Sequence, residues 1–387
     1  MVPLLRQHPL RTHCSARLLL SGDEYFNKIE EVILSAKHYL HVQFYIYDPD
    51  ATGNKITKLL KDAVRRGVEV MLVADAIGSE HLTSKWVKEI EEAGILFKHF
   101  SPKNKFFRIG RRMHHKIVVA DGELALIGGI NIADKYSGFH GQRAWLDFGV
   151  ELKGPVVRDI EKICEPVWKK KVLRNYFHPL HTANQWVGNL KLRLIQNDWW
   201  RRRIEISKAY KDALRKANKE IIIVASYLLP GTSFRRLMKK AARRGVRIKI
   251  MLGGHSDVKL VKPATMYFYE WMMRQGMEIY EWQPSILHGK LAIVDDEWAT
   301  VGSYNLNALS DYGSLELNVE IFDADFARSS RAKVEELITS GCKNVDFDEF
   351  MKSSTLILYV YRWFCYKAVR VLLRLLFMMM KRDRLKI

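Results

Sequence analysis

Two distant parts of this chain have similar sequences. The segment LLKDAVRRGVEVMLVADAIGS (59–79) recurs as LMKKAARRGVRIKIMLGGHSD (237–257). Each copy predicts an amphipathic helix that ends at a glycine, Gly67 or Gly245, followed by a β-branched run typical of a buried strand. A chain with such a repeat is constrained to fold as two similar units.

Further matched segments accompany this repeat. Strand-like runs that end in proline precede the two copies, at 39–49 and 220–230. Each half therefore predicts strand, helix and strand in βαβ order, with parallel strands. The spacing between matched segments changes by only a few residues along the chain. We expect an α/β protein of two mixed-sheet halves related by a pseudo-twofold axis, residues 21–180 and 181–345.

A polar motif, H-x-K-x4-D-x6-G-[GS]-x-N, occupies equivalent places in the two halves. The first copy has His114, Lys116, Asp121, Gly128, Gly129 and Asn131, and the second has His288, Lys290, Asp295, Gly302, Ser303 and Asn305. Because side chains two apart on a strand share a face, the histidine and the lysine of each copy project together. One such motif alone is weak evidence, whereas six spaced positions that recur twice predict a catalytic site.

These side chains suit phosphoryl transfer. A neutral imidazole can attack phosphorus near pH 7 and can also act as general acid or base. The lysines supply positive charge to the transition-state oxygens, and neutral donors from Asn131, Ser303 and Asn305 assist in binding the phosphate. One histidine forms a phosphohistidine, while the other protonates the leaving alcohol and then deprotonates the acceptor. This double displacement needs no metal or other cofactor, and no carboxylate cluster in the sequence predicts a metal site.

Four acidic residues accompany the two motifs. Asp121 and Asp295 end their strands; they belong to the candidate catalytic set, but we expect scaffold roles, with the carboxylate binding the lysine or backbone amides. Asp147 and Glu316 begin another matched pair, DFGVE and ELNVE. A carboxylate bonded to one imidazole nitrogen fixes the tautomer and raises the basicity of the other nitrogen, so we expect these two residues to orient the histidines. The alternative for this pair is a surface position on a strand.

The charge of the chain predicts an anionic partner. Lys and Arg number 63 against 43 Asp and Glu, a net charge of +20, which favours nucleic acid or an anionic lipid surface. The four widely spaced cysteines predict neither a structural zinc site nor a disulfide framework, and favour a reducing, cytoplasmic setting. Residues 1–20 are basic and lack acids, and we expect a tail there. No long uncharged apolar stretch predicts a transmembrane helix.

Within the C-terminal segment, residues 346–387, residues 354–380 depart in composition from the rest of the chain and are rich in large apolar side chains. Four of its basic residues are spaced to share one helical face, namely Lys367, Arg370, Arg374 and Lys381, and Arg362 lies off this stripe. A basic stripe on an apolar helix is typical of the headgroup layer of an anionic membrane, so we expect 352–387 to bind a membrane surface. The alternative is a helix packed on the protein or on a partner. A further basic cluster, Arg235 to Lys240, is compatible with headgroups, nucleic-acid phosphates or solvent.

The duplicated motif resembles that of the phospholipase D superfamily, whose signature is this repeated H-x-K-x4-D pattern. Within that superfamily, the chain is most similar to bacterial cardiolipin synthases of the short type, which lack N-terminal transmembrane helices. The resemblance covers residues 21–345 and rests on segments 111–134, 239–254 and 287–307. Gly129 departs from the superfamily pattern, which has serine at this position, although cardiolipin synthases often have glycine there.

The resemblance implies a duplicated phospholipase D-like fold and transfer of a phosphatidyl group between two phosphatidylglycerol molecules, giving cardiolipin and glycerol. His114 would be the nucleophile and His288 the acid and base, although the near-symmetric halves leave this choice open. Lys116 and Lys290 would bind phosphate. The resemblance also implies a peripheral enzyme on the cytoplasmic face of the cell membrane, without a nucleic-acid partner. A lipid hydrolase that releases phosphatidic acid and a nuclease or phosphodiesterase of the same chemistry remain alternatives, and the second substrate and oligomeric state stay open.

Overall fold

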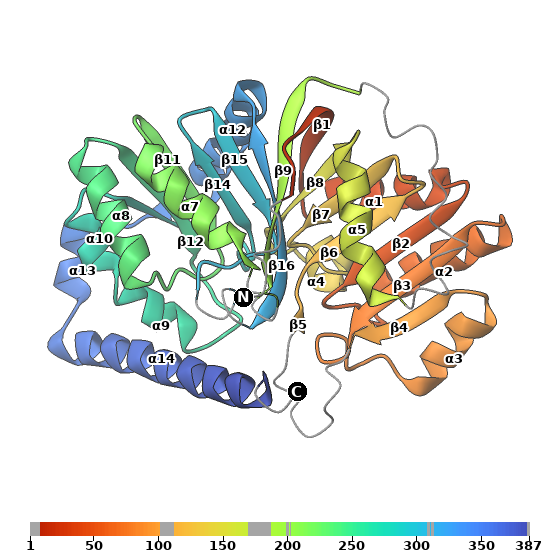
Figure 1. Cartoon of the computed structure of the whole chain (residues 1–387). Coiled ribbons are helices and arrows are strands. Elements are labelled where there is room, and N and C mark those ends of the chain that lie inside the picture. Colours follow the sequence, from red (N-terminus) through yellow and green to blue (C-terminus); the bar gives the residue numbers. More distant parts are fainter. Residues whose placement is uncertain are drawn as a thin grey trace.

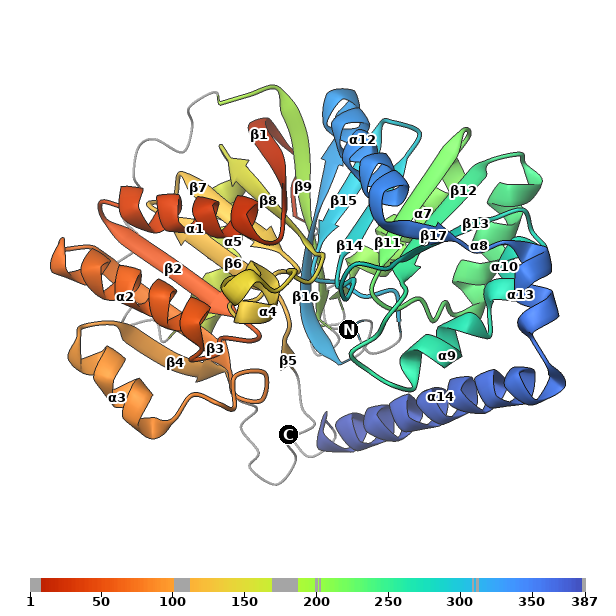
Figure 2. The ribbon, with the colours of Figure 1, turned by 180° about the vertical axis from the view of Figure 1, so that it is seen from behind.

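The computed structural model consists of two α/β halves that lie side by side (Figure 1, Figure 2). Each half is a mixed β-sheet with helices on both faces. The structure describes residues 8–100, 112–168, 187–198, 201, 203–307, 310 and 313–384, except for the side chains of residues 140 and 376–384. The boundary that the sequence predicts between the halves, at 180/181, lies outside the described residues.

The first sheet is built around the predicted βαβ unit. Its strands follow one another in space in the order β1 (Arg11–Leu20), β8 (Phe148–Lys153), β7 (Leu124–Gly128), β6 (Lys116–Ala120), β2 (Tyr39–Phe44), β3 (Glu69–Asp75) and β4 (Leu96–Phe100). The pairs β2–β3 and β3–β4 are parallel and the others are antiparallel. On one face lie α1 (Asp23–Ser35), α2 (Ala51–Arg65) and α3 (Ser84–Glu92), and on the other lies α5 (Val156–Cys164).

The second sheet repeats this order. Its strands are β9 (Leu190–Asp198), β16 (Ser314–Phe322), β15 (Trp298–Gly302), β14 (Lys290–Val294), β11 (Glu220–Ala225), β12 (Arg247–Gly253), β13 (Glu278–Trp282) and β17 (Cys342–Asn344). The pairs β11–β12 and β12–β13 are again the parallel ones. Strands β8, β7, β6, β2, β3 and β4 thus correspond to β16, β15, β14, β11, β12 and β13. The predicted fold class, a duplicated mixed-sheet α/β protein, is confirmed.

The helices of the second half also follow the repeat. One face carries α7 (Glu205–Lys216) and α8 (Thr232–Arg243), and the other carries α12 (Ala324–Gly341). In Figure 1, α5 and α7 lie in front of their sheets, whereas α1 and α12 lie in front in Figure 2. The short helices are α4 (Asp134–Ser137), α9 (Val261–Met266), α10 (Tyr269–Met273), α13 (Phe347–Ser353), and the 3-10 turns η1 (Phe139–Gly141) and η2 (Glu165–Val167).

A left-handed glycine ends the repeated helix in each half, as predicted. Gly67 follows α2 with φ of 87°, and Gly245 follows α8 with φ of 85°. Glycine adopts this conformation without the steric cost that a β-carbon imposes. The chain then enters β3 or β12, so the repeated segment is one helix and one strand of a parallel unit.

Strand β1 joins the two sheets, because it pairs with β8 on one side and with β9 on the other. The expectation of a tail over residues 1–20 is therefore wrong for residues 11–20. Their basic side chains suggested an exposed segment, but Cys14 and Leu19 are buried, and Arg11 forms a two-point ion pair with Asp159. Two short strands add to the junction, β10 (Arg203–Ile204) beside β9 and β5 (Arg112–Met113) beside β16.

Helix α14 (Leu356–Arg384) runs along the edge of the second half, below α9 in Figure 1, toward the midline of the molecule. It packs through Tyr366, whose ring stacks on Tyr267 with centroids 5.2 Å apart. Arg362, which lies off the predicted basic stripe, is buried on this side and donates to Ser354 Oγ at 2.7 Å. Among the described residues, no helix has the length and apolar character needed to cross a bilayer.

Candidate active site

The two H-x-K segments lie where the halves of the molecule meet. Strands β6 and β14 begin at the two lysines, and each histidine lies two residues earlier, just outside its strand. The backbone amide of His114 donates to the carbonyl of Leu315, at 3.0 Å, next to β16 residue Glu316 in the second half. The backbone amide of His288 donates to the carbonyl of Leu146, at 2.7 Å, in the first half. Each histidine is therefore held by the opposite half of the chain.

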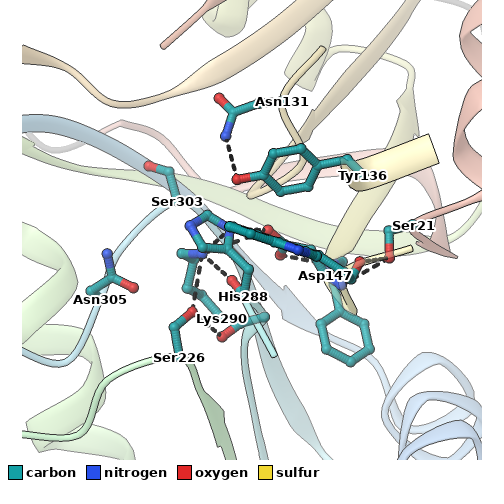
Figure 3. A network of polar contacts seen from close by, with 12 residues as sticks. Ser21, Asn131, Tyr136, Asp147, Ser226, His288, Lys290, Ser303 and Asn305 are labelled. Carbon is teal, nitrogen blue, oxygen red and sulfur yellow. Dashed lines mark hydrogen bonds and ion pairs between the residues drawn. The ribbon is translucent and has the colours of Figure 1, made fainter. Parts of the chain in front are cut away.

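Each histidine side chain also contacts a carboxylate of the opposite half. Nδ1 of His114 lies 2.9 Å from Oε2 of Glu316. Nδ1 of His288 lies 2.6 Å from Oδ2 of Asp147, a contact shown in Figure 3. Because Nδ1 bonds to the carboxylate, Nε2 of each imidazole is left to react. Both acids lie against histidines as the sequence analysis expected, but nothing in the repeat indicated that the pairs cross between the halves.

Both motif lysines are buried beside the histidines. Lys116 Nζ donates to the carbonyl of His114, and Lys290 Nζ donates to the carbonyl of His288. Lys290 Nζ also lies 3.3 Å from Ser226 Oγ. Burial lowers the pKa of Lys116 to about 7, with Lys290 as the next cause, and burial also lowers the pKa of Lys290. Two neighbouring buried cations repel each other, so a bound phosphate anion would stabilise both charges.

Burial lowers the pKa of both histidines as well. The pKa of His288 falls to about 4, with Lys290 lowering it further and Asp147 opposing the shift. For His114, burial is again the largest cause, and Glu316 opposes it. Both imidazoles are therefore neutral near pH 7 and able to attack phosphorus. A bound phosphodiester carries a negative charge, which favours protonation and so prepares one histidine to act as an acid.

Asp121 and Asp295 lie at the far ends of the motif strands. The carboxylate of Asp121 accepts the backbone amides of residues 37, 38 and 39, each at 2.8 Å, and that of Asp295 accepts the amides of residues 218, 219 and 220 at 2.6, 2.7 and 2.9 Å. These hydrogen bonds to backbone amides fit the expected scaffold role. A five-residue strand separates each aspartate from its lysine by roughly 16 Å, and a place in the catalytic set stays a prediction. No group of three or more His, Cys, Asp or Glu side chains in the described part of the chain is arranged to hold a metal ion.

The predicted neutral phosphate ligands are buried, as the lysines are. The side chain of Asn131 is fully buried, where it accepts the amide of Ile46 at 3.0 Å and donates to the hydroxyl of Tyr136 at 2.9 Å. Ser303 Oγ donates to Glu316 Oε2 at 2.5 Å. Oδ1 of Asn305 is buried and has no hydrogen-bond partner among the described residues. Asn131 and Ser303 thus brace the site, and contacts of all three side chains with phosphate stay predictions.

Gly129 and Ser303, at the position where the motif copies differ, give the two half-sites different shapes. A β-carbon at Gly129 would lie 2.3 Å from Oδ1 of Asp147, far inside contact distance. Asp147 therefore fills the space that a serine side chain would need. In the other half-site Ser303 is present and donates to the longer Glu316. The small Gly129 thus lies next to the shorter acid, Asp147, whereas Ser303 lies next to the longer acid, Glu316.

Aromatic side chains that the sequence analysis missed surround the histidines. The ring of Tyr45 lies 5.0 Å from that of His114, and the ring of Tyr136 lies 5.4 Å from that of His288. Tyr45 and Ser226 follow β2 and β11 at equivalent positions, where the chain leaves the carboxyl end of a parallel strand. Side chains at such strand ends commonly line the sites of α/β proteins. This rule could have identified Tyr45 and Ser226 from the sequence.

The fold and the paired half-sites define a protein of the phospholipase D class. A solved structure of phosphatidylserine synthase from Haemophilus influenzae Rd KW20 aligns with a TM-score of 0.74 over 94% of this chain and 95% of that chain, at 15% identity. Polyphosphate kinase from Porphyromonas gingivalis aligns with a TM-score of 0.57 over 86% of this chain and 49% of that chain, at 13% identity. At these identities the likeness concerns the fold alone.

Sequence comparison identifies the family. Residues 29–165 and 210–338 match the family described as "Cardiolipin synthase, PLD-like domain". Cardiolipin synthase B of Escherichia coli (strain K12) is 34% identical over 337 residues, which cover 85% of this chain and 82% of the relative. Cardiolipin synthase of Geobacillus kaustophilus (strain HTA426) is 28% identical over 339 residues, which cover 84% of this chain and 67% of the relative. The chain belongs to this family, which confirms the resemblance and the predicted enzyme class, a phosphatidyltransferase.

Proposed function

We propose that this protein makes cardiolipin and glycerol from two phosphatidylglycerol molecules through a phosphohistidine intermediate. The observation that carries the proposal is the crossed arrangement, in which two neutral imidazoles meet at one interface with Nδ1 bound to a carboxylate. A double displacement through a phosphohistidine requires two reactive histidines at one phosphorus, and cations that stabilise the phosphate oxygens. The names of the relatives supply the substrate class.

In the first step, Nε2 of His114 attacks phosphorus of the donor lipid and the bond to the glycerol headgroup oxygen breaks. His288 gives that oxygen its Nε2 proton, and glycerol leaves. In the second step, His288 takes the proton from a hydroxyl of the second phosphatidylglycerol, whose oxygen attacks phosphorus. The N–P bond then breaks, and cardiolipin and neutral His114 result. Lys116 and Lys290 stabilise the phosphoryl oxygens in both steps.

A membrane position supports this chemistry, because both substrates are lipids. Helix α14 exposes a face of large apolar side chains, which include Leu356, Ile357, Val360, Tyr361, Phe364, Val371, Leu372 and Leu375. An apolar face of this kind beside basic residues is typical of a helix that lies in the interface of an anionic bilayer. We propose residues 346–387 as the membrane-associating segment of a peripheral enzyme that works on the cytoplasmic face.

Product analysis tests the proposal. Purified protein is incubated with vesicles that contain labelled phosphatidylglycerol, and the lipids are separated by thin-layer chromatography. Cardiolipin with released glycerol is the expected result. Phosphatidic acid as the sole product would instead identify a hydrolase, and no turnover of the lipid would favour the nuclease alternative.

Substitution of either histidine tests the paired mechanism. His114→Ala and His288→Ala should each abolish transfer, because each half-reaction needs one nucleophile and one proton carrier. Thermal unfolding of the purified variants provides the control for folding. Retention of more than about a hundredth of the wild-type rate in either folded variant would contradict the mechanism.

A further inference from the structure

A second cationic site lies away from the histidines, between the start of α8 and helix α14. It is a cavity of about 260 Å³. Its wall combines three arginines with apolar side chains, among them Arg235, Arg370, Arg374, Leu229, Val369 and Leu373. The arginines come from parts of the chain that are far apart in sequence, so the docking of α14 on the second half creates this cluster.

The described residues do not neutralise the positive charge of the cavity. Among the described residues that line it, none is acidic, and none of the three arginines forms an ion pair. Nε of Arg235 is buried and has no hydrogen-bond partner among the residues that the structure describes, while its guanidinium lies 5.2 Å from the ring of Phe268. Within the described part of the chain, the hydrogen bond of the Arg370 guanidinium goes to the hydroxyl of Tyr366, at 3.5 Å. Gathering uncompensated cations costs free energy through repulsion, which a bound anion relieves.

The start of α8 adds backbone donors to the same wall. Its N-cap residue, Gly231, provides no side-chain cap, and the first turn contains no acid. The first amides of a helix lack intrahelical acceptors and favour an anion. Guanidinium groups match the oxygens of a phosphate with two parallel hydrogen bonds. The ligand that fits this combination is a phosphate group.

The orientation of α14 indicates where that phosphate comes from. The sequence analysis expected the basic stripe to meet the membrane directly. In the structure, Arg370 and Arg374 are exposed but also line the cavity beside the protein body, and the apolar side chains of Phe364, Val371 and Leu375 are exposed next to them. A bilayer that receives this apolar face would place its phosphates at the height of the arginines, since headgroups lie just above the acyl chains. The side chain of Lys381 lies outside the described residues.

We infer that this cavity binds the headgroup phosphate of an anionic phospholipid, as a second lipid site separate from the catalytic one. The inference rests on the membrane part of the proposed function. A neighbouring cavity of about 270 Å³ shares the wall formed by residues 229–232 and extends to Tyr304, Leu306 and Asn307, close after Ser303. The amide of Leu229 donates to the carbonyl of Leu306 at 3.2 Å. The bound headgroup therefore lies one loop away from the catalytic segment of the second half.

Two double variants of equal charge test the inference. Arg235→Gln with Arg370→Gln removes two cations from the cavity. Arg236→Gln with Lys367→Gln removes two exposed cations from the same helices, outside the cavity lining. Both pairs are made in a chain that also carries His114→Ala, so that turnover does not alter the lipid. Binding to phosphatidylcholine vesicles with and without phosphatidylglycerol is measured by flotation at constant ionic strength, and thermal unfolding verifies that each variant folds.

Each cation near a charged surface contributes roughly fivefold to binding, so both double variants should lose affinity for vesicles with phosphatidylglycerol. The cavity pair should lose about tenfold more than its control, because it also loses hydrogen bonds to phosphate. An equal loss for the two pairs would overturn the inference and leave the membrane proposal intact. Absence of binding by the parent chain would overturn both. Suppression of the tenfold difference by inorganic phosphate at constant ionic strength would support recognition of the phosphate group of the lipid.

Discussion

Gly129→Ser, which restores the superfamily serine to the first motif, should damage the enzyme. The added β-carbon would lie 2.3 Å from Oδ1 and 2.6 Å from Oδ2 of Asp147. Relief of this overlap requires the carboxylate to move by roughly 1 Å, given that nonbonded carbon–oxygen contacts are rarely below about 3.2 Å. The 2.6 Å hydrogen bond from His288 Nδ1 would then be lost. Loss of a buried charge-assisted contact to a reacting group costs about 3 kcal/mol in the transition state, or a kcat about 100-fold lower.

The second half-site supplies the design of a rescue. There, serine and glutamate coexist, with Ser303 Oγ donating to Glu316 Oε2 at 2.5 Å. Gly129→Ser combined with Asp147→Glu should therefore recover kcat to within about tenfold of the wild type, a coupling that a double-mutant cycle measures directly. The assay is transfer from labelled phosphatidylglycerol, with kcat and KM determined separately and folding followed by thermal unfolding.

Two outcomes would refute this reasoning. A single Gly129→Ser variant with near wild-type kcat would mean that Asp147 is not displaced or does not orient His288. If the double variant has no higher kcat than Gly129→Ser alone, the pairing of serine with glutamate seen at Ser303 and Glu316 does not apply to the first half-site. The matched control is Ser303→Gly, which removes a donor to Glu316 without steric overlap and should lower kcat by no more than about tenfold.

Three further predictions concern pH, stability and the C-terminal helix. The mechanism needs a protonated His288, but burial lowers the pKa of His288 in the free enzyme to about 4. Lys116, with a pKa of about 7, also loses its charge as the pH rises. The value of kcat/KM should therefore peak below pH 6.5 and fall at higher pH. The profile of kcat should peak at higher pH, since bound lipid favours protonation, and coincident optima would contradict this view. Asp121→Asn should lower the unfolding free energy by about 1–3 kcal/mol in urea titrations, because a neutral amide replaces the acceptor of three backbone amides, with kcat changed by less than about twofold. Deletion of residues 352–387 should release the protein from anionic vesicles in sedimentation assays, and unchanged binding would place the membrane contact elsewhere.

Much of this architecture was predictable because it depends on local patterns that occur twice. The repeated helix, its glycine stop and the following strand follow from residue order alone, and the motif histidines and lysines follow from their spacing. The strand at residues 11–20 was not predictable in this way. Its burial depends on a gap between two sheets that only the assembled fold creates, and its charges are neutralised by distant residues such as Asp159.

The cationic cavity also depends on the assembled fold and could not be predicted from the sequence. Helical spacing correctly grouped Arg370 and Arg374 on one side of α14, but spacing cannot tell which side meets the protein. That choice is made by Tyr366, which stacks on Tyr267, and by the burial of Arg362. These contacts place the arginines beside Arg235 and leave the apolar side chains exposed.

The crossed pairs link catalysis to the assembly of the two halves. A first half alone would hold His114 without its carboxylate, and would leave Asp147 without His288 and Lys290. An uncompensated buried carboxylate costs several kcal/mol, so exchange of these partners stabilises the interface as well as the reactive tautomers. The duplication therefore supplies more than a second histidine. Each half provides the nucleophilic or acidic group of one half-site and the orienting group of the other, and the geometry needed for phosphoryl transfer exists only when the halves are packed together.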